Sequence, residues 1–190
     1  MKDRRNMPAS EHTLIVIALK DELPAYLVPD WQVAVCGVGK VNAAVNMQRL
    51  ITEHRPRQVI NLGTAGAVTD SLEGLVEVGR VCQRDMDVTG LGVEAGITPF
   101  DDLGGEIILS DSSVICGTGD NFLQGPPEIP CDIVDMELYA LAKVCQMNEI
   151  PIISYKYISD KADDSASHDW KQALKTAAQS FAAFLNSIRG

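Results

Sequence analysis

Short apolar runs rich in β-branched residues alternate with amphipathic segments along most of this chain, and this alternation strongly constrains its fold. Such runs predict buried strands, whereas the segments between them predict helices. Strands separated by helices usually pair in parallel, so the pattern favours an α/β domain with a mixed, mostly parallel sheet flanked by helices. The predicted strands cover residues 14–19, 32–36, 58–62, 75–82, 106–109, 114–117 and 150–158.

Three segments carry apolar residues at helical spacing. In Val41–Arg55 these residues recur with a period of about 3.6, and the segment ends before Pro56, which would break a helix. The same spacing recurs in Met136–Met147 and, more strongly, in His168–Arg189. We expect residues 14–190 to form a single domain that ends on an amphipathic helix, preceded by a polar, flexible segment at 1–13.

The charge of the chain limits its partners. Its 190 residues carry a formal net charge of −10, and the lysines and arginines form no cluster. Nucleic acids and anionic membranes are bound by concentrated positive charge, so neither is an expected partner. The sequence has no run of about 18 apolar residues that could span a bilayer, and the run at 14–19 is too short for the core of a secretion signal. We expect a soluble, cytoplasmic protein.

The five cysteines and three histidines show neither the paired spacing of a metal site nor that of a disulfide framework. Most of the cysteines lie in or beside apolar segments, where a free thiol behaves as a small hydrophobic group. We therefore expect structural cysteines, and neither a metal nor a cofactor.

Acidic residues follow three of the predicted strands. Asp160 closes the strand at 150–158, Glu22 follows the first strand, and Glu137 lies just before the second predicted helix. Ligands of open α/β sheets bind at the carboxyl ends of strands. Asp also caps helices, and the helix dipole favours an acid such as Glu137, so each residue alone has a structural explanation. Three such acids together are harder to explain as three caps.

Two glycine-rich segments and one aromatic residue add to this pattern. Residues 37–40 and 63–66 are predicted to be turns after strands, where glycine lets the backbone approach a ligand, although tight helix packing explains them as well. Phe122, in a loop after the strand at 114–117, either anchors packing or stacks on a flat heterocycle.

Taken in order, the motifs at 37–44, 61–66, 119–122, 134–137 and 158–160 resemble those of the nucleoside phosphorylase and nucleosidase superfamily, in particular its nucleosidases for 5′-methylthioadenosine and S-adenosylhomocysteine. The resemblance implies that Asp160, with Ser159 beside it, protonates or hydrogen-bonds the purine N7, and that Glu22 activates the attacking water. The further substrate contacts that it implies are Glu137 and Met136 at the ribose, Thr64 close to it, Phe122 and Leu123 at the base, and Trp170 over the 5′ substituent.

The implied reaction is hydrolysis of the N-glycosidic bond of a purine nucleoside by a homodimer, without cofactor or metal. Asp160 favours a 6-aminopurine, as in 5′-methylthioadenosine or S-adenosylhomocysteine. Phosphorylases of the family carry an arginine where this chain has Asn61, which favours water over phosphate as the nucleophile. Two alternatives remain open: a phosphorylase with an unrecognised phosphate site, and a nucleoside-binding protein that has lost turnover.

The chain also departs from the family pattern. The segments at 23–31 and 101–113 are shorter than in the usual member, and Lys156 stands where relatives often carry an arginine near the sugar. Leu91 stands where similar nucleosidases place an aromatic residue that enters the partner's pocket. These differences predict an altered pocket for the 5′ substituent.

Overall fold

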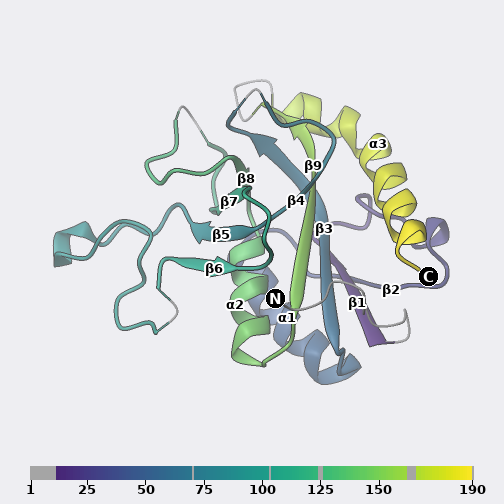
Figure 1. The fold of residues 1–190 in the computed structure, drawn as a ribbon, viewed down its shortest axis with the longest axis horizontal. Helices are drawn as coiled ribbons and strands as arrows, with labels where there is room; N and C mark the ends of the chain where they lie inside the picture. Colours follow the sequence, from purple (N-terminus) through teal and green to yellow (C-terminus); the bar gives the residue numbers. More distant parts are fainter. Residues whose placement is uncertain (1–11, 70, 103, 124–125, 162–165, 190) are drawn as a thin grey trace.

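A twisted sheet runs through the middle of the molecule (Figure 1). The computed structural model describes residues 12–69, 71–102, 104–123, 126–161 and 166–189. Within these residues the strands are β1 (Thr13–Ile17), β2 (Gln32–Val35), β3 (Gln58–Ala67), β4 (Leu75–Glu77), β5 (Arg80–Gln83), β6 (Glu106–Ile108), β7 (Ile115–Thr118), β8 (Ile133–Asp135) and β9 (Ile152–Asp160).

The strands pair in the order β2-β1-β3-β8-β7-β5-β6, while β9 pairs with the other edge of β3 and β4 pairs with β9. Neighbours are parallel in the pairs β1–β2, β1–β3, β3–β9, β5–β7 and β7–β8. The pairs β3–β8, β4–β9 and β5–β6 are antiparallel. The prediction of a mixed, mostly parallel sheet is therefore confirmed.

Helices cover both faces of this sheet. The helices α1 (Lys40–His54) and α2 (Leu138–Met147) lie on one face, and α3 (Ala166–Ser187) lies on the other (Figure 1). Successive residues of β1 point to opposite faces, so Leu14 and Val16 join the core under α1 and α2, whereas Ile15 packs in the core with Phe181 of α3. This double burial explains why β1 reads as an unbroken apolar run.

Two of the predicted boundaries are wrong. Residues 63–66, predicted as a turn, continue β3, because Gly63 and Thr64 pair with Lys156 and Tyr157 of β9. The predicted strand at 75–82 is divided into β4 and β5 at Gly79, where the backbone passes so near Ser112 that a Cβ would lie 1.7 Å from the Ser112 carbonyl oxygen. Sequence analysis also missed β8, a strand of only 3 residues.

The described residues of 23–31 and 101–113, the segments predicted to be shorter than in the family, contain little regular structure. The 3-10 helix η2 (Ala25–Leu27) lies within 23–31, and β6 lies within 101–113. A second 3-10 helix, η3 (Thr89–Leu91), ends on the exposed Leu91. Of the segment 1–13, residues 1–11 lie outside the described residues, and Thr13 is the buried first residue of β1.

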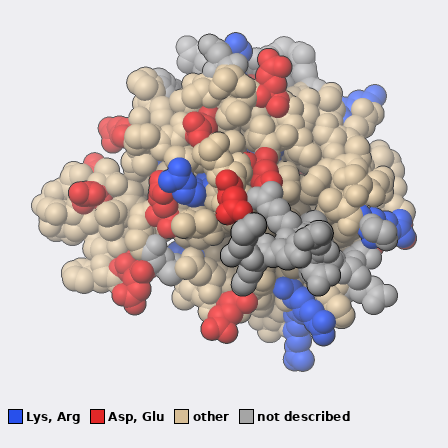
Figure 2. Space-filling view, viewed as in Figure 1, with Lys and Arg blue, Asp and Glu red and all other residues tan. Residues whose placement is uncertain are grey.

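The five cysteines are free and buried, as predicted. Burial raises the pKa of the Cys36 and Cys145 thiols to about 12, so neither is an activated nucleophile. Among the described residues, no helix has both the length and the apolar character needed to cross a bilayer. Figure 2 shows acidic side chains spread over one face of the molecule, with basic side chains in small separate groups.

Candidate active site

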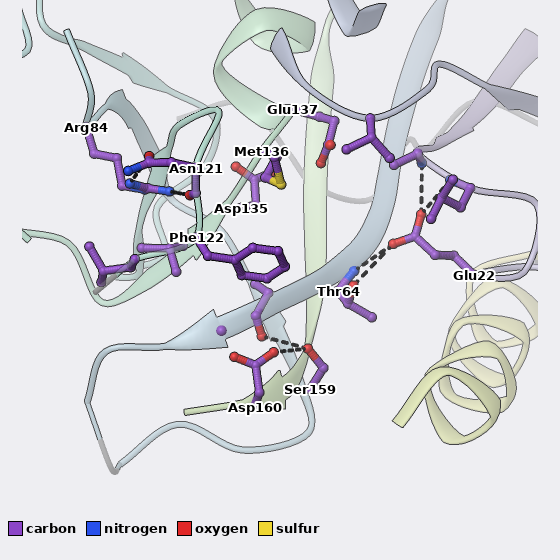
Figure 3. Close-up of a pocket in the computed structure, with 17 residues that line it drawn as sticks. Glu22, Thr64, Arg84, Asn121, Phe122, Asp135, Met136, Glu137, Ser159 and Asp160 are labelled. Atoms are coloured by element: carbon purple, nitrogen blue, oxygen red, sulfur yellow. Dashed lines mark hydrogen bonds between the residues drawn. The ribbon is translucent and has the colours of Figure 1, made fainter. Parts of the chain in front are cut away.

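A cavity of about 290 Å³ opens where β1, β3, β5, β7, β8 and β9 end (Figure 3). All the predicted site residues with described side chains line this cavity: Glu22, Thr64, Phe122, Leu123, Met136, Glu137, Ser159 and Asp160. Trp170 lies in α3, but its side chain is outside the described part of the chain. Ligands bind at strand carboxyl ends in α/β proteins, so the position of the cavity makes it the candidate site.

Glu22 is held by hydrogen bonds from two strands. Its Oε2 accepts the backbone N–H groups of Ala18 (2.9 Å) and Leu19 (3.0 Å), just after β1. Its Oε1 accepts the N–H (3.1 Å) and the hydroxyl (3.3 Å) of Thr64, within β3. The buried carboxylate is therefore fixed at the cavity wall with Thr64 beside it.

A β-bulge near the end of β9 places Ser159 and Asp160 together. Ala65 of β3 pairs with Ile158, but the next residue, Gly66, pairs with Asp160, so Ser159 is the extra residue. A bulge breaks the strict alternation of side chains, which allows both residues to line the cavity. The Ser159 hydroxyl donates to Asp160 Oδ2 (2.6 Å). Asp160 ends β9 as predicted, and it is not the N-cap of α3, which begins at Ala166.

Glu137 stands at the N-cap position of α2 without making a side-chain capping bond. Instead its Oε1 accepts the N–H of Gly39 (2.9 Å), the residue that precedes α1. Gly39 has a φ of 88°, which favours glycine. The turn at 37–40 thus brings backbone into contact with a cavity acid. Burial, with the charge of Asp135 added, raises the pKa of Glu137 to about 7.

A buried ion pair that sequence analysis missed lies beside these acids. Lys156 Nζ of β9 is 2.8 Å from Asp135 Oδ2 of β8, and both side chains are almost fully buried. Burial alone would lower the pKa of Lys156, but the negative charges of Asp135 and Glu137 raise it above its ordinary value. Burial would likewise raise the pKa of Asp135, but Lys156 holds it below the usual range. The signal for this pair was a lysine inside an apolar strand.

The loop after β7 forms a further wall. Phe122 projects toward the cavity with 65% of its surface exposed, so it does not anchor the loop by packing in the core (Figure 3). Arg84 and Asn121, which sequence analysis did not select, also line the cavity. Asn121 lies in the motif at 119–122 but was given no role there, and Arg84 lies in none of the quoted motifs.

This fold and this site define a family. The model of the phosphorylase superfamily matches residues 30–101 and 107–188, and the chain belongs to that superfamily. The 5′-methylthioadenosine/S-adenosylhomocysteine nucleosidase of Geobacillus sp. (strain WCH70) is 32% identical over 180 residues, covering 80% of this chain and 77% of the relative. The enzyme of the same name from Marinomonas sp. (strain MWYL1) is 28% identical with the same coverage.

Solved structures show the same fold. The Helicobacter pylori 5′-methylthioadenosine/S-adenosylhomocysteine nucleosidase with butyl-thio-DADMe-Immucillin-A has a TM-score of 0.82 at 21% identity, covering 92% of this chain and 96% of that one. Futalosine hydrolase of the same organism has a TM-score of 0.83 at 21% identity, covering 92% and 95%. At such identities the likeness establishes the fold.

The raised pKa of Glu137 predicts a pH-dependent stability that Glu137→Gln removes. Between its ordinary value of 4.5 and about 7, the folded protein keeps a proton on Glu137 that the unfolded chain releases. Rising pH across this window therefore destabilises the folded state, by up to about 3 kcal/mol. The amide in the variant can still accept the Gly39 N–H but cannot ionise. Urea unfolding should show the variant gaining stability relative to the unmodified protein from about pH 5 to about pH 8.

Glu94→Gln is the matched control, because Glu94 is exposed. Its stability should follow that of the unmodified protein at every pH. Parallel curves for Glu137→Gln and the unmodified protein would contradict the prediction.

Proposed function

We propose that this protein hydrolyses the N-glycosidic bond of a purine nucleoside and releases the free base and a ribose derivative. The observation that carries the proposal is the position of Glu22, Glu137 and Asp160, which come from three different strand ends and line one cavity beside the ring of Phe122. The superfamily and the nucleosidase names of the relatives support it.

The chemistry of the bond explains why such residues are needed. As it breaks, positive charge develops on the ribose and negative charge on the leaving base, in a transition state similar to that of glycosidases. A fixed carboxylate near the sugar stabilises the first charge, and an acid that donates a proton or hydrogen bond to the base stabilises the second. The cavity offers fixed carboxylates at separate positions, so both charges can be stabilised at once.

We assign the base to the side of the cavity formed by Asp160 and Phe122. Asp160 would share or donate a proton at the purine N7, while its contact with the Ser159 hydroxyl sets the orientation of its carboxyl group. Phe122 would stack on the base, and the backbone of Leu123 would bond its edge. A carboxyl group at N7 also lies near the 6-position, where it can accept a hydrogen bond from an amino group, so we propose a 6-aminopurine.

We assign the sugar and the attacking water to the other side. Glu22 would orient the water, because four hydrogen bonds hold its carboxylate in one position. Glu137 would bind the ribose hydroxyls, with Met136 packing beside the sugar and Thr64 close to it. The names of the relatives support a 5′-methylthioadenosine or S-adenosylhomocysteine substrate, whose 5′ substituent we place near Trp170.

The surroundings of Asn61 support water as the nucleophile. Its Nδ2 donates to the carbonyl of Val16 (3.1 Å) and its Oδ1 accepts the hydroxyl of Ser154 (2.9 Å), so the side chain is used inside the sheet. The nearby cation Lys156 is already paired with Asp135. A phosphate dianion would need cations that are available to bind it, and Arg84, the cation that lines the cavity, already donates to Asn121.

We further propose a homodimer in a reducing compartment such as the cytoplasm. Val41 and Val45, one turn apart on α1, are 74% and 64% exposed, and the exposed Val38, three residues before Val41, lines the cavity. Burying this surface against a second copy would remove it from water and cover the cavity beside it. The free thiols suit a reducing compartment.

Base release without phosphate tests the reaction. Incubation with 5′-methylthioadenosine, adenosine or inosine, followed by chromatography, should yield free adenine from an adenine nucleoside at the same rate with and without phosphate. A strict phosphate requirement would establish a phosphorylase instead. Tight nucleoside binding without base release would indicate a binding protein.

Asp160→Asn should lose most of the rate while the fold is retained. General acid catalysis contributes about 10²–10⁴-fold, and an amide cannot supply the proton. Steady-state kinetics measure the loss, and circular dichroism verifies the fold. Asp102→Asn serves as the control, because Asp102 is exposed and is not among the residues that line the cavity. A variant with nearly full activity would remove Asp160 from the mechanism.

Val41→Glu combined with Val45→Glu should convert a dimer into a monomer, because the added charges would be buried in the interface. Light scattering after size exclusion measures the mass. The exposed residue Gln179 on α3 provides the control Gln179→Glu, which should remain dimeric. An unmodified protein that elutes as a monomer would refute the dimer.

A further inference from the structure

The two residues before Phe122 are held by two consecutive residues at the end of β5. The strands β5 and β7 are parallel neighbours, with Gln83 opposite Thr118. Their ladder continues one step further, because the Arg84 N–H donates to the Thr118 carbonyl (2.9 Å). The loops that leave β5 and β7 therefore start side by side at the edge of the cavity.

Asp85 holds the first of these residues. Its Oδ2 accepts the N–H of Asp120 (2.9 Å), and its Oδ1 is 2.5 Å from Lys40 Nζ. Lys40 begins α1, and its own N–H donates to Asp120 Oδ1 (2.7 Å). Asp120 is thus fixed from both β5 and α1.

Arg84 holds the second residue. Its Nη1 donates to Asn121 Oδ1 (2.9 Å), and its Nη2 donates to the Asn121 carbonyl (Figure 3). The guanidinium lies over Gly119, where a Cβ would come within 2.8 Å of Arg84 Cζ. The planar, two-pronged donor set of arginine suits this grip, because it binds a side-chain oxygen and a backbone oxygen of one residue.

These contacts matter because the next residue, Phe122, has no core packing to hold it. An exposed aromatic ring must lose conformational freedom when a ligand stacks on it, and this cost weakens binding unless the backbone is already ordered. The hydrogen bonds to Asp120 and Asn121 order the backbone of the two residues directly before Phe122.

We propose that Arg84 is a positioning residue for the purine subsite. It holds Asn121 so that the ring of Phe122 and the backbone of Leu123 are already in position to bind the base. This inference rests on the proposed function, since it assumes that the base stacks on Phe122. Arg84 acts only through the conformation of the loop, so it stabilises the bound substrate and the transition state to the same extent. Its loss should therefore raise KM and leave kcat almost unchanged, a signature of uniform binding.

Kinetics of Arg84→Ala with 5′-methylthioadenosine test this directly. We expect KM to rise about tenfold, the scale of lost hydrogen bonds to a charged group, with kcat within about twofold of the unmodified value. Arg80→Ala is the matched control, because Arg80 lies on the same strand and pairs with Glu106 outside the cavity lining. It should change neither constant.

Two further variants keep the test decisive if Arg84→Ala folds poorly. Gly119→Ala displaces the guanidinium without removing it, and Arg84→Lys keeps the charge but not the two-pronged geometry. Both should raise KM in the same direction, by less than Arg84→Ala. Asn121→Ala combined with Arg84→Ala should cost less than the sum of the single changes, because both act on one contact.

Unchanged KM in these variants, additive effects, or a fall in kcat at constant KM would overturn the proposal while the nucleosidase function stands. If the unmodified protein releases no base, the proposed function fails separately. Calorimetric titration with adenine then tests whether Arg84 positions the loop for the base. About tenfold weaker adenine binding by Arg84→Ala would support it. Equal binding by the two proteins, or no binding by either, would overturn it.

Discussion

The ion pair between Lys156 and Asp135 allows several acids to share one small space. Asp135, Glu137 and Glu22 all line the cavity, and without a cation burial and mutual repulsion would oppose the ionisation of Asp135 and Glu137. Lys156 extends from β9 and Asp135 closes β8, so the pair also joins strands on the two edges of β3. Removing one partner would leave an unpaired buried charge, at a cost of about 3–5 kcal/mol.

Asp135 also links this pair to its surroundings. It accepts the hydroxyl of Thr118 (2.5 Å) on β7 and the N–H of Leu138 (2.9 Å) in the first turn of α2. The start of α2 is therefore tied to the same carboxylate that neutralises Lys156. Because Glu137 immediately precedes α2, the charge balance and the position of the proposed ribose acid depend on one residue.

The sequence predicted those parts of the fold and site that depend on local pattern. The α/β class followed from apolar periodicity, and Glu22, Glu137 and Asp160 were selected because three acids at strand ends are harder to explain as three helix caps than as one site. The glycines at 63–66 were misassigned as a turn, since the sequence does not reveal that β9 pairs along this whole stretch of β3. The roles of Asp135 and Arg84 were missed because they come from partners far away in the chain, Lys156 and Asn121.

The anchoring of Glu22 does not depend on the segment that follows it, which the sequence predicts to be shorter than in the usual family member. All four hydrogen bonds to the carboxylate come from residues that precede it or belong to β3, and none comes from the stretch at 23–31. A change in the length of that stretch therefore need not move the Glu22 carboxylate. Insertions and deletions there can accumulate during evolution, while the residue proposed to direct the water stays where it is.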